Sequence, residues 1–213
     1  MIFFRMFLYL SIFTANGYAW DADHHRQWIG VFNKKKFKED YSFWQEYQWR
    51  YNADQGRTQQ TLLRFGVLKQ VSSAHEVGFL LGLVESGVTQ EIRPTIQHTY
   101  VHDLDEENIL SLRSRLEYRD IEKNSVQSLR YRIHTGFRHL LNLRYSLLIS
   151  NELFLNLTRE QWSGDRAIER NRLFTGLRID ESYGRWEVGY LYQHAPRQTA
   201  SIQEHIAVLY FYF

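Results

Sequence analysis

Residues 109–121 read ILSLRSRLEYRDI, and this stretch decides the fold class. Apolar residues at alternate positions face one way and charged residues the other: Leu110, Leu112, Leu116 and Tyr118 against Arg113, Arg115, Glu117 and Arg119. Successive side chains of a β-strand point to opposite faces, whereas helical spacing would mix the two sets. The stretch therefore predicts a strand with one apolar and one arginine-rich face.

The same alternation recurs along the chain. Residues 126–138 repeat it, with Leu129, Tyr131, Ile133 and Phe137 opposed to Ser128, Arg130, Arg132, His134 and Arg138. Comparable segments lie at 27–33, 41–51, 61–70, 75–86, 91–103, 143–157, 168–179, 186–194 and 205–213. Most hold about 10 to 13 residues, which is longer than the roughly five or six of soluble strands and close to the length of a tilted membrane strand.

This pattern predicts an all-β fold, a single antiparallel transmembrane β-barrel. Eleven alternating segments are present, whereas bacterial single-chain barrels have an even number of strands. An even count requires either that residues 27–33, the weakest segment, do not span the membrane or that one further strand is present. The expected barrel therefore has about ten to twelve strands.

Alternation alone does not say which face points outward. In a soluble barrel the apolar face would fill the interior, whereas in a membrane barrel it would meet lipid. Aromatic residues of the apolar face gather near strand ends, as a membrane-interface girdle requires: Tyr41, Tyr51, Tyr100, Tyr118, Trp186 and Tyr192. The chain ends at Phe213 within IAVLYFYF, which resembles the C-terminal signal for outer-membrane assembly. We therefore expect a monomer that contacts outer-membrane lipid and the barrel-assembly machinery.

The first residues differ from the rest of the chain. Arg5 precedes an apolar run over residues 6–15, and Gly17-Tyr18-Ala19 supplies small residues at a cleavage site after Ala19. This is the layout of a signal peptide, and the run is too short for the roughly 20 residues of a membrane anchor. The predicted organisation is a signal peptide over 1–19 and a barrel over 20–213, exported to the outer membrane of a Gram-negative bacterium.

Composition narrows the function classes. The formal net charge is +2 with the charges spread along all 213 residues, whereas a nucleic-acid-binding protein needs a clustered basic face. The chain has no Cys, which leaves no disulfide framework and no Cys-ligated metal. We expect no nucleic-acid partner.

Loop lengths predict the orientation. The three longest gaps, 52–60, 158–167 and 195–204, fall in one alternating set, and the gaps of the other set are short. Long loops of outer-membrane barrels face outward and short turns face the periplasm. The final strand should therefore end in the periplasm.

At the arginine-rich strands the sequence resembles the outer-membrane β-barrel family of unknown function catalogued as DUF2490. The matching pieces run in order through the chain: Trp28; Arg113-Ser-Arg115-Leu-Glu117-Tyr-Arg119; Leu129-Arg130-Tyr131-Arg132; Asn151-Glu152-Leu-Phe154; Asn171-Arg172 with Gly176-Leu177; and Glu187-Val-Gly189-Tyr190. The resemblance implies a bacterial outer-membrane barrel, and it implies no ligand, cofactor or catalytic residue.

The strongest constellation is an inward ladder of charges. We expect an interior charge cluster of Arg113, Arg115, Glu117, Arg119, Arg130, Arg132, Glu152, Arg178 and Glu187. Pairing residues across the tight turns sets Glu117 opposite Arg130, Arg113 opposite His134, Arg130 opposite Glu152, and Arg178 opposite Glu187. Residues directly opposite lie about 5 Å apart at Cβ, which permits ion pairs. Salt bridges would then hold the lumen closed or weakly conducting.

An alternative is a narrow pore that favours anions. Arginine is in excess on the face assigned to the lumen: Arg50, Arg64, Arg93, Arg113, Arg115, Arg119, Arg130, Arg132, Arg138, Arg144, Arg170, Arg172 and Arg178. The acids on that face are fewer: Glu46, Glu76, Glu91, Glu117, Glu152 and Glu187.

A lipid-modifying hydrolase is the rival class, because such barrels use a His that activates a Ser hydroxyl. No motif of a known outer-membrane phospholipase or deacylase is present, so we predict no catalytic residue, cofactor or metal site. His98 and His102 share a face that should meet lipid, and His24-His25 beside Asp21 and Asp23 is more typical of a solvated tail than of a metal site. A loop His close to a Ser or Asp would favour the hydrolase.

Overall fold

The computed structural model describes residues 20–87, 89–122, 126–158, 167–196 and 201–213, without the side chains of residues 20–23 and 126. The predicted signal peptide lies outside the described residues. The described chain forms eleven strands: β1 (Trp20–Lys38), β2 (Tyr41–Asn52), β3 (Arg57–Gln70), β4 (His75–Ser86), β5 (Thr89–Asp103), β6 (Asn108–Ile121), β7 (Val126–Leu140), β8 (Tyr145–Asn156), β9 (Ile168–Glu181), β10 (Gly184–Ala195) and β11 (Ser201–Tyr212).

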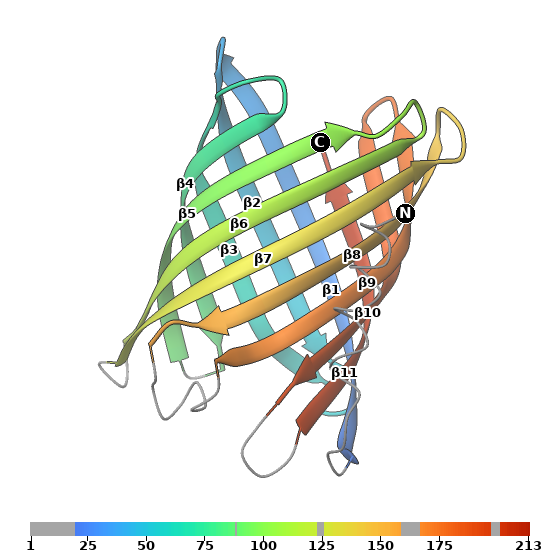
Figure 1. Ribbon diagram of the computed structural model, residues 1–213. Coiled ribbons are helices and arrows are strands. Elements are labelled where there is room, and N and C mark those ends of the chain that lie inside the picture. Colours follow the sequence, from blue (N-terminus) through green and yellow to red (C-terminus); the bar gives the residue numbers. More distant parts are fainter. Residues whose placement is uncertain (1–19, 88, 123–125, 159–166, 197–200) are drawn as a thin grey trace.

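The strands close into one barrel, in which each pairs with its neighbours in sequence and β1 pairs with β11 (Figure 1). Ten of the pairings are antiparallel, and the β1–β11 pairing is parallel. A sheet of alternating strand directions closes without a parallel pair only if the strand number is even. The observed count lies within the predicted range but departs from the even number expected of bacterial barrels.

The weakest predicted segment, 27–33, is the core of the longest strand. β1 covers 19 residues, with Gln27 opposite both Tyr51 of β2 and Ala207 of β11. Its backbone N–H and C=O groups therefore have partners on both sides. Pairing with β2 and β11 extends β1 to Trp20–Lys38, well beyond the residues 27–33 in which alternation is visible in the sequence.

The apolar face points outward. Ile96 and Phe79 are 62% and 60% exposed, whereas Glu117 and Arg64 in the interior are 0% and 2% exposed. This distribution is that of a membrane barrel and the reverse of that of a soluble one. Aromatic rings gather at strand ends, as in the contact of Trp186 with Phe211 at 4.4 Å between ring centroids. No helix among the described residues is long and apolar enough to cross a membrane.

The two ends of the barrel differ. We call the end with the connections 53–56, 87–88, 122–125, 157–167 and 196–200 the long-loop end, and the opposite end, with 39–40, 71–74, 104–107, 141–144 and 182–183, the short-turn end. Phe213 lies at the short-turn end, where its N–H donates to the carbonyl oxygen of Phe32 at 3.0 Å. Because β1 and β11 are parallel, Trp20 lies at the long-loop end, opposite Ser201.

Candidate functional site

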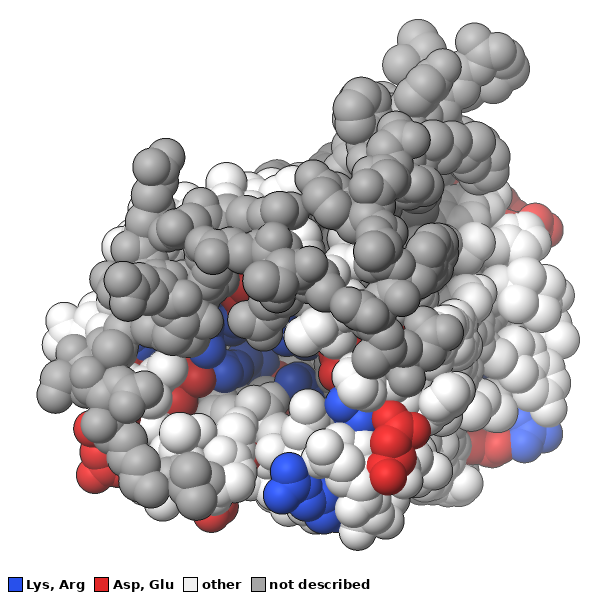
Figure 2. All heavy atoms as spheres, turned by 90° about the horizontal axis from the view of Figure 1, so that it is seen from below, with Lys and Arg blue, Asp and Glu red and all other residues white. Residues whose placement is uncertain are grey.

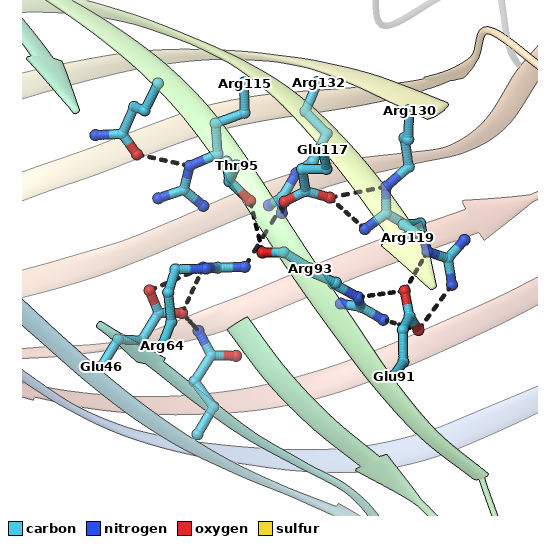
Figure 3. A network of polar contacts seen from close by, with 12 residues as sticks. Glu46, Arg64, Glu91, Arg93, Thr95, Arg115, Glu117, Arg119, Arg130 and Arg132 are labelled. Atoms are coloured by element: carbon cyan, nitrogen blue, oxygen red, sulfur yellow. Dashed lines mark hydrogen bonds and ion pairs between the residues drawn. The ribbon is translucent and has the colours of Figure 1, made fainter. Parts of the chain in front are cut away.

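A carboxylate with no exposed surface lies at the centre of the lumen. Glu117 of β6 accepts hydrogen bonds from Arg130 at 2.5 and 3.0 Å and from Arg132 at 2.6 Å (Figure 3). Arg64 lies 3.7 Å away on β3, and β4 and β5 separate its strand from β6. The arginine therefore reaches Glu117 through the interior and not along the wall.

A second shared carboxylate lies on β8. Glu152 accepts a hydrogen bond from Arg132 at 2.6 Å and forms ion pairs with Arg113 at 3.4 Å and Arg172 at 3.5 Å. Arg132 thus bridges Glu117 and Glu152. The planar guanidinium suits this role because its N–H groups project in a fixed fork.

A third shared carboxylate enters the lumen through a β-bulge. Phe154 of β8 lies opposite Arg170 and Leu155 lies opposite Ile168, so Glu169 is the extra residue of β9. A bulge re-aims side chains relative to the regular alternation. The side chain of Glu169 is 8% exposed and pairs with Arg170 at 2.5 Å, Arg130 at 3.0 Å and Arg119 at 3.9 Å.

Two further acids complete the network. Glu91 accepts from Arg93 at 2.6 Å and from Arg119 at 2.5 Å, and Glu46 accepts from Arg64 at 2.9 Å (Figure 3). Arg119, Arg130, Arg132 and Arg64 each contact two of the five acids. Shared arginines therefore link Glu46, Glu117, Glu169 and Glu91 in one chain of ion pairs. Arg132 joins Glu152 to this chain at Glu117.

Arginine exceeds acid in this interior. Glu117, Glu152 and Glu169 are each shared by three guanidinium groups. Arg50 instead donates to the amide oxygens of Gln48 and Gln60, and Arg115 donates to that of Gln97. Neutral amides satisfy the N–H groups without cancelling the charge. The described lumen is therefore net positive.

Two inward aromatic rings contact some of these arginines. The guanidinium of Arg50 lies 4.1 Å and that of Arg172 lies 4.7 Å from the ring centroid of Trp28. Arg172 and Arg132 each lie 4.5 Å from the ring centroid of Phe154. Both rings are buried. Cation–π attraction to the ring faces favours these placements and partly offsets the repulsion between like charges.

The network lines a cavity of about 690 Å³ within the barrel. An apolar patch of Trp28, Phe174, Leu191, Ile206 and Val208 covers one side of the wall. Seen from the long-loop end, the hollow of the barrel shows lysine and arginine side chains in its depth (Figure 2). A solute that enters from this end would meet a positively charged interior.

The structure tests the predicted register of the interior charge cluster. Glu117 lies opposite Arg130 and Arg113 lies opposite His134, as predicted. The predicted pairing of Arg130 with Glu152 is wrong, because Arg130 lies opposite Asn156 and Glu152 lies opposite His134.

The error arises in the turn between β7 and β8. β7 runs on to Leu140, so the turn comprises residues 141–144 and not the expected 139–142. Asn142 fixes this turn, since its side-chain oxygen accepts the N–H groups of Arg144 and Tyr145 at 2.9 Å. The shift in the centre of the turn displaces every pair on the hairpin.

Arg178 and Glu187 also lie opposite each other, as predicted, but they do not join the central network. Arg178 pairs with Asp180 at 2.7 Å, and Glu187 lies 3.6 Å from Arg185 and accepts from the Tyr212 hydroxyl at 3.1 Å. These residues form a separate polar group towards the short-turn end.

One residue predicted to face the lumen does not, and three charged interior residues were not predicted. The assignment of Arg144 to the lumen is wrong, because its side chain is 56% exposed in a turn, where it pairs with Glu181. Sequence reasoning missed Glu169, which the bulge turns inward, and the ion pair of Arg26 with Glu204 at 3.2 Å. That pair joins β1 to β11 and becomes visible only once the barrel is closed.

Several histidines lie outside the lumen, on the outer face of the barrel and at its long-loop end. His98 lies on the outward face of β5, where its Nε2 is 3.0 Å from His75 Nδ1, and His102 on the same face stacks with Tyr100. At the long-loop end the backbone N–H of His25 donates to Asp54 at 3.0 Å and holds the pKa of that carboxyl below its ordinary value.

The same carboxylate lies 3.4 Å from the His24 ring and 3.5 Å from the His25 ring. A loop Asp therefore does approach a His, although the described contacts of these two rings include no serine hydroxyl. Within the described part of the chain, no group of three His, Cys, Asp or Glu residues could hold a metal.

Comparisons with known proteins agree with this architecture. The fold is similar to that of the NanC porin, with a TM-score of 0.56, 8% sequence identity, and coverage of 84% of this chain and 93% of that chain. Two structures of the KdgM porin, one in complex with disordered oligogalacturonate, give TM-scores of 0.47 and 0.49 at 11% identity, covering 78% of this chain and 80% of theirs. No curated protein sequence matches the chain.

The sequence comparison identifies the family. The profile described as "Protein of unknown function (DUF2490)" matches residues 25–204, which is most of the chain. The predicted resemblance is thereby confirmed. This protein belongs to the DUF2490 family.

Proposed function

We propose that this protein is an integral barrel of the outer membrane of a Gram-negative bacterium, with a lumen that salt bridges close to bulk flow. The outward apolar face and the porin-like fold support the membrane location. The observation that carries the closed lumen is the contact of Arg64 with Glu117, two interior side chains from strands that do not pair.

The size of the barrel agrees with this proposal. About eight strands leave an interior that side chains fill, and about 16 to 18 leave an aqueous channel. Eleven strands lie between these limits, and here the interior also holds long arginine side chains. Arg64 with Glu117, and Arg130 with Glu169, place guanidinium groups across the space that a channel would need.

Planar-bilayer recording tests the closed lumen directly. The wild type should give little or no conductance, whereas Arg64→Ala, which removes the contact with Glu117, should raise it. Arg144→Ala removes an arginine from an exposed turn and should leave the conductance unchanged. A large, steady conductance in the wild type would contradict the proposal.

A narrow anion-leaning pore is the second candidate, and the arginine excess favours it. Any residual current through the wild type should then be anion-selective, because the described interior is net positive and repels cations. The reversal potential in a salt gradient measures this selectivity. Cation selectivity would exclude this candidate.

Export and assembly are part of the same proposal. The signal peptide should be removed after Ala19, so N-terminal sequencing of the membrane-bound protein should begin at Trp20, and an intact Met1 would contradict this. Phe213, 58% exposed and stacked on Phe211, is available to the barrel-assembly machinery. The protein is expected to be a monomer surrounded by lipid.

A further inference from the structure

Buried hydrogen-bond donors without acceptors line the lumen cavity. Five buried side-chain atoms have no hydrogen-bond partner among the described residues: Trp28 Nε1, Arg64 Nε, Arg113 Nε, Arg170 Nε and Arg185 Nε. All five are N–H donors, and all five residues line the same cavity. Buried polar groups normally have partners. The cavity lining therefore has more hydrogen-bond donors than its own acceptors satisfy.

Two of these donors lie in a part of the cavity that is rich in arginine. Trp28 is 4% exposed, and its ring contacts the guanidinium groups of both Arg50 and Arg172. The guanidinium group of Arg170 lies beside that of Arg172, at 5.6 Å and 4.5 Å from the ring centroid of Phe154. Among the described residues, the Arg50 guanidinium contacts the side-chain amide oxygens of Gln48 and Gln60 and the Trp28 ring. Three cations and an indole N–H thus face one part of the cavity.

The nearby acids do not neutralise this group. Glu152 lies 3.5 Å from Arg172 but is shared with Arg113 and Arg132. Glu169 pairs with Arg170 but is shared with Arg119 and Arg130. Each carboxylate is therefore divided among three guanidinium groups, and a local excess of positive charge remains.

We propose that Trp28, Arg50, Arg170 and Arg172 form an oxyanion-binding site inside the barrel. An oxyanion such as a carboxylate or a phosphate offers only acceptors and carries the missing negative charge. Guanidinium groups bind both through paired N–H groups, and the indole N–H adds a neutral donor. A cavity of about 690 Å³ lies within the usual range for small-molecule sites. Because the closed sheet separates the cavity from lipid, the oxyanion enters from the aqueous side.

Calorimetric titration of the folded, full-length barrel tests the site. Inorganic phosphate and succinate are titrated separately in detergent with a non-anionic buffer, and sodium chloride holds the ionic strength constant. The wild type should show saturable binding of at least one of these oxyanions. Absence of saturable binding of both would overturn the proposal.

Arg50→Gln removes a cation whose described hydrogen bonds go only to neutral amides. It should weaken binding on the order of 10- to 100-fold, as expected for a hydrogen bond to a charged group. Arg144→Gln, an equal change of charge in an exposed turn, is the matched control and should bind as the wild type does. Equal affinities of Arg50→Gln and the wild type would also overturn the proposal.

Trp28→Phe serves as a second variant, which keeps an aromatic ring beside Arg50 and Arg172 but removes the N–H donor. It should weaken binding by about 2- to 10-fold, the effect of one neutral hydrogen bond. The heat-dependent shift in gel mobility shows that each variant is folded. The oxyanion site and the closed lumen are tested separately. If the wild-type barrel conducts ions but binds phosphate at Arg50, the closed lumen is refuted and the oxyanion site is not.

Discussion

Arg130 and Glu169 form an ion pair across 39 residues of sequence and between strands that do not pair. Arg130 Nη1 donates to both carboxylate oxygens of Glu169, at 3.0 and 3.3 Å, while its Nε and Nη2 donate to Glu117. One guanidinium thus joins β6, β7 and β9. The bulge at Glu169 makes this possible, because it adds an inward side chain where regular alternation would place an outward one.

Removing Arg130 should destabilise the barrel. Arg130→Ala leaves Glu117 with Arg64 and Arg132, and Glu169 with Arg119 and Arg170, in a poorly hydrated interior. Breaking a buried ion pair by removing one partner costs up to roughly 3–5 kcal/mol. Arg130→Lys should recover only part of this, because lysine keeps the charge but loses the fork. Denaturant midpoints measure the effect, with Arg144→Ala as the exposed control. Equal midpoints for Arg130→Ala and the wild type would show that the pair is not formed.

The pairing through the bulge should appear as an energetic coupling. A double-mutant cycle of Arg130→Ala and Glu169→Ala should give an interaction free energy of about 0.5–3 kcal/mol, as contacting residues do. The control is a second cycle of Arg130→Ala with Glu187→Ala. Glu187 lies in the separate polar group, so this cycle should give an interaction free energy near zero. Similar couplings in the two cycles would argue against the inward placement of Glu169.

Orientation in the membrane can be tested with single cysteines, since the chain has none. Ala53 is exposed at the long-loop end and Ser73 is exposed at the short-turn end. A membrane-impermeant maleimide should label Ala53→Cys on intact cells, and Ser73→Cys only after the outer membrane is broken. The opposite pattern would reverse the topology.

The parallel seam predicts an unusual position for the N-terminus of the barrel. Trp20 lies at the long-loop end with Ser201, whereas the N-terminus of an even-stranded barrel lies beside its C-terminus. An epitope inserted directly after Ala19 should be detected by antibody on intact cells. A control epitope after Phe213 should be detected only in permeabilised cells. Detection of both only after permeabilisation would contradict the parallel pairing of β1 with β11.

Phe213 should matter for assembly more than for stability. Its exposed ring stacks on Phe211, and its backbone N–H, which any residue retains, makes the contact with Phe32. Phe213→Ser should therefore lower the amount of folded barrel in the outer membrane, while the purified variant unfolds at nearly the same denaturant concentration. Gel mobility before and after heating measures the folded fraction. An equal folded fraction in cells would exclude an assembly role.

Much of the fold follows from local sequence. The alternation in residues 109–121 gives a strand, its two faces and its length, because side-chain direction in a strand depends only on position parity. A tight turn predicted at 122–125 gives the pairing of Glu117 with Arg130, since a hairpin turn sets the register of its two strands, and the register of β6 and β7 confirms this pairing. All eleven segments could be found in this way, including the weak one at 27–33.

The charged site was only partly accessible from sequence. Position parity predicts which side chains face the lumen, but it does not predict the partners of Arg130. Because the β7–β8 turn lies further along the chain than expected, Glu152 is opposite His134 and not opposite Arg130. Arg130 instead pairs with Glu169, which the bulge in β9 turns inward. One residue more or less in a turn or strand changes every later pairing, and alternation contains no signal for such a residue.

The sequence by itself determined the strands, the outward apolar face and the arginine-rich interior, because these depend on a period of two residues. Only the tertiary structure decided the parallel closure of β1 on β11, the contact of Arg64 with Glu117 through the lumen, and the placement of Arg50 and Arg172 about Trp28. These contacts join residues that are distant in sequence, and they form only where closing the barrel brings opposite walls within reach of an arginine side chain.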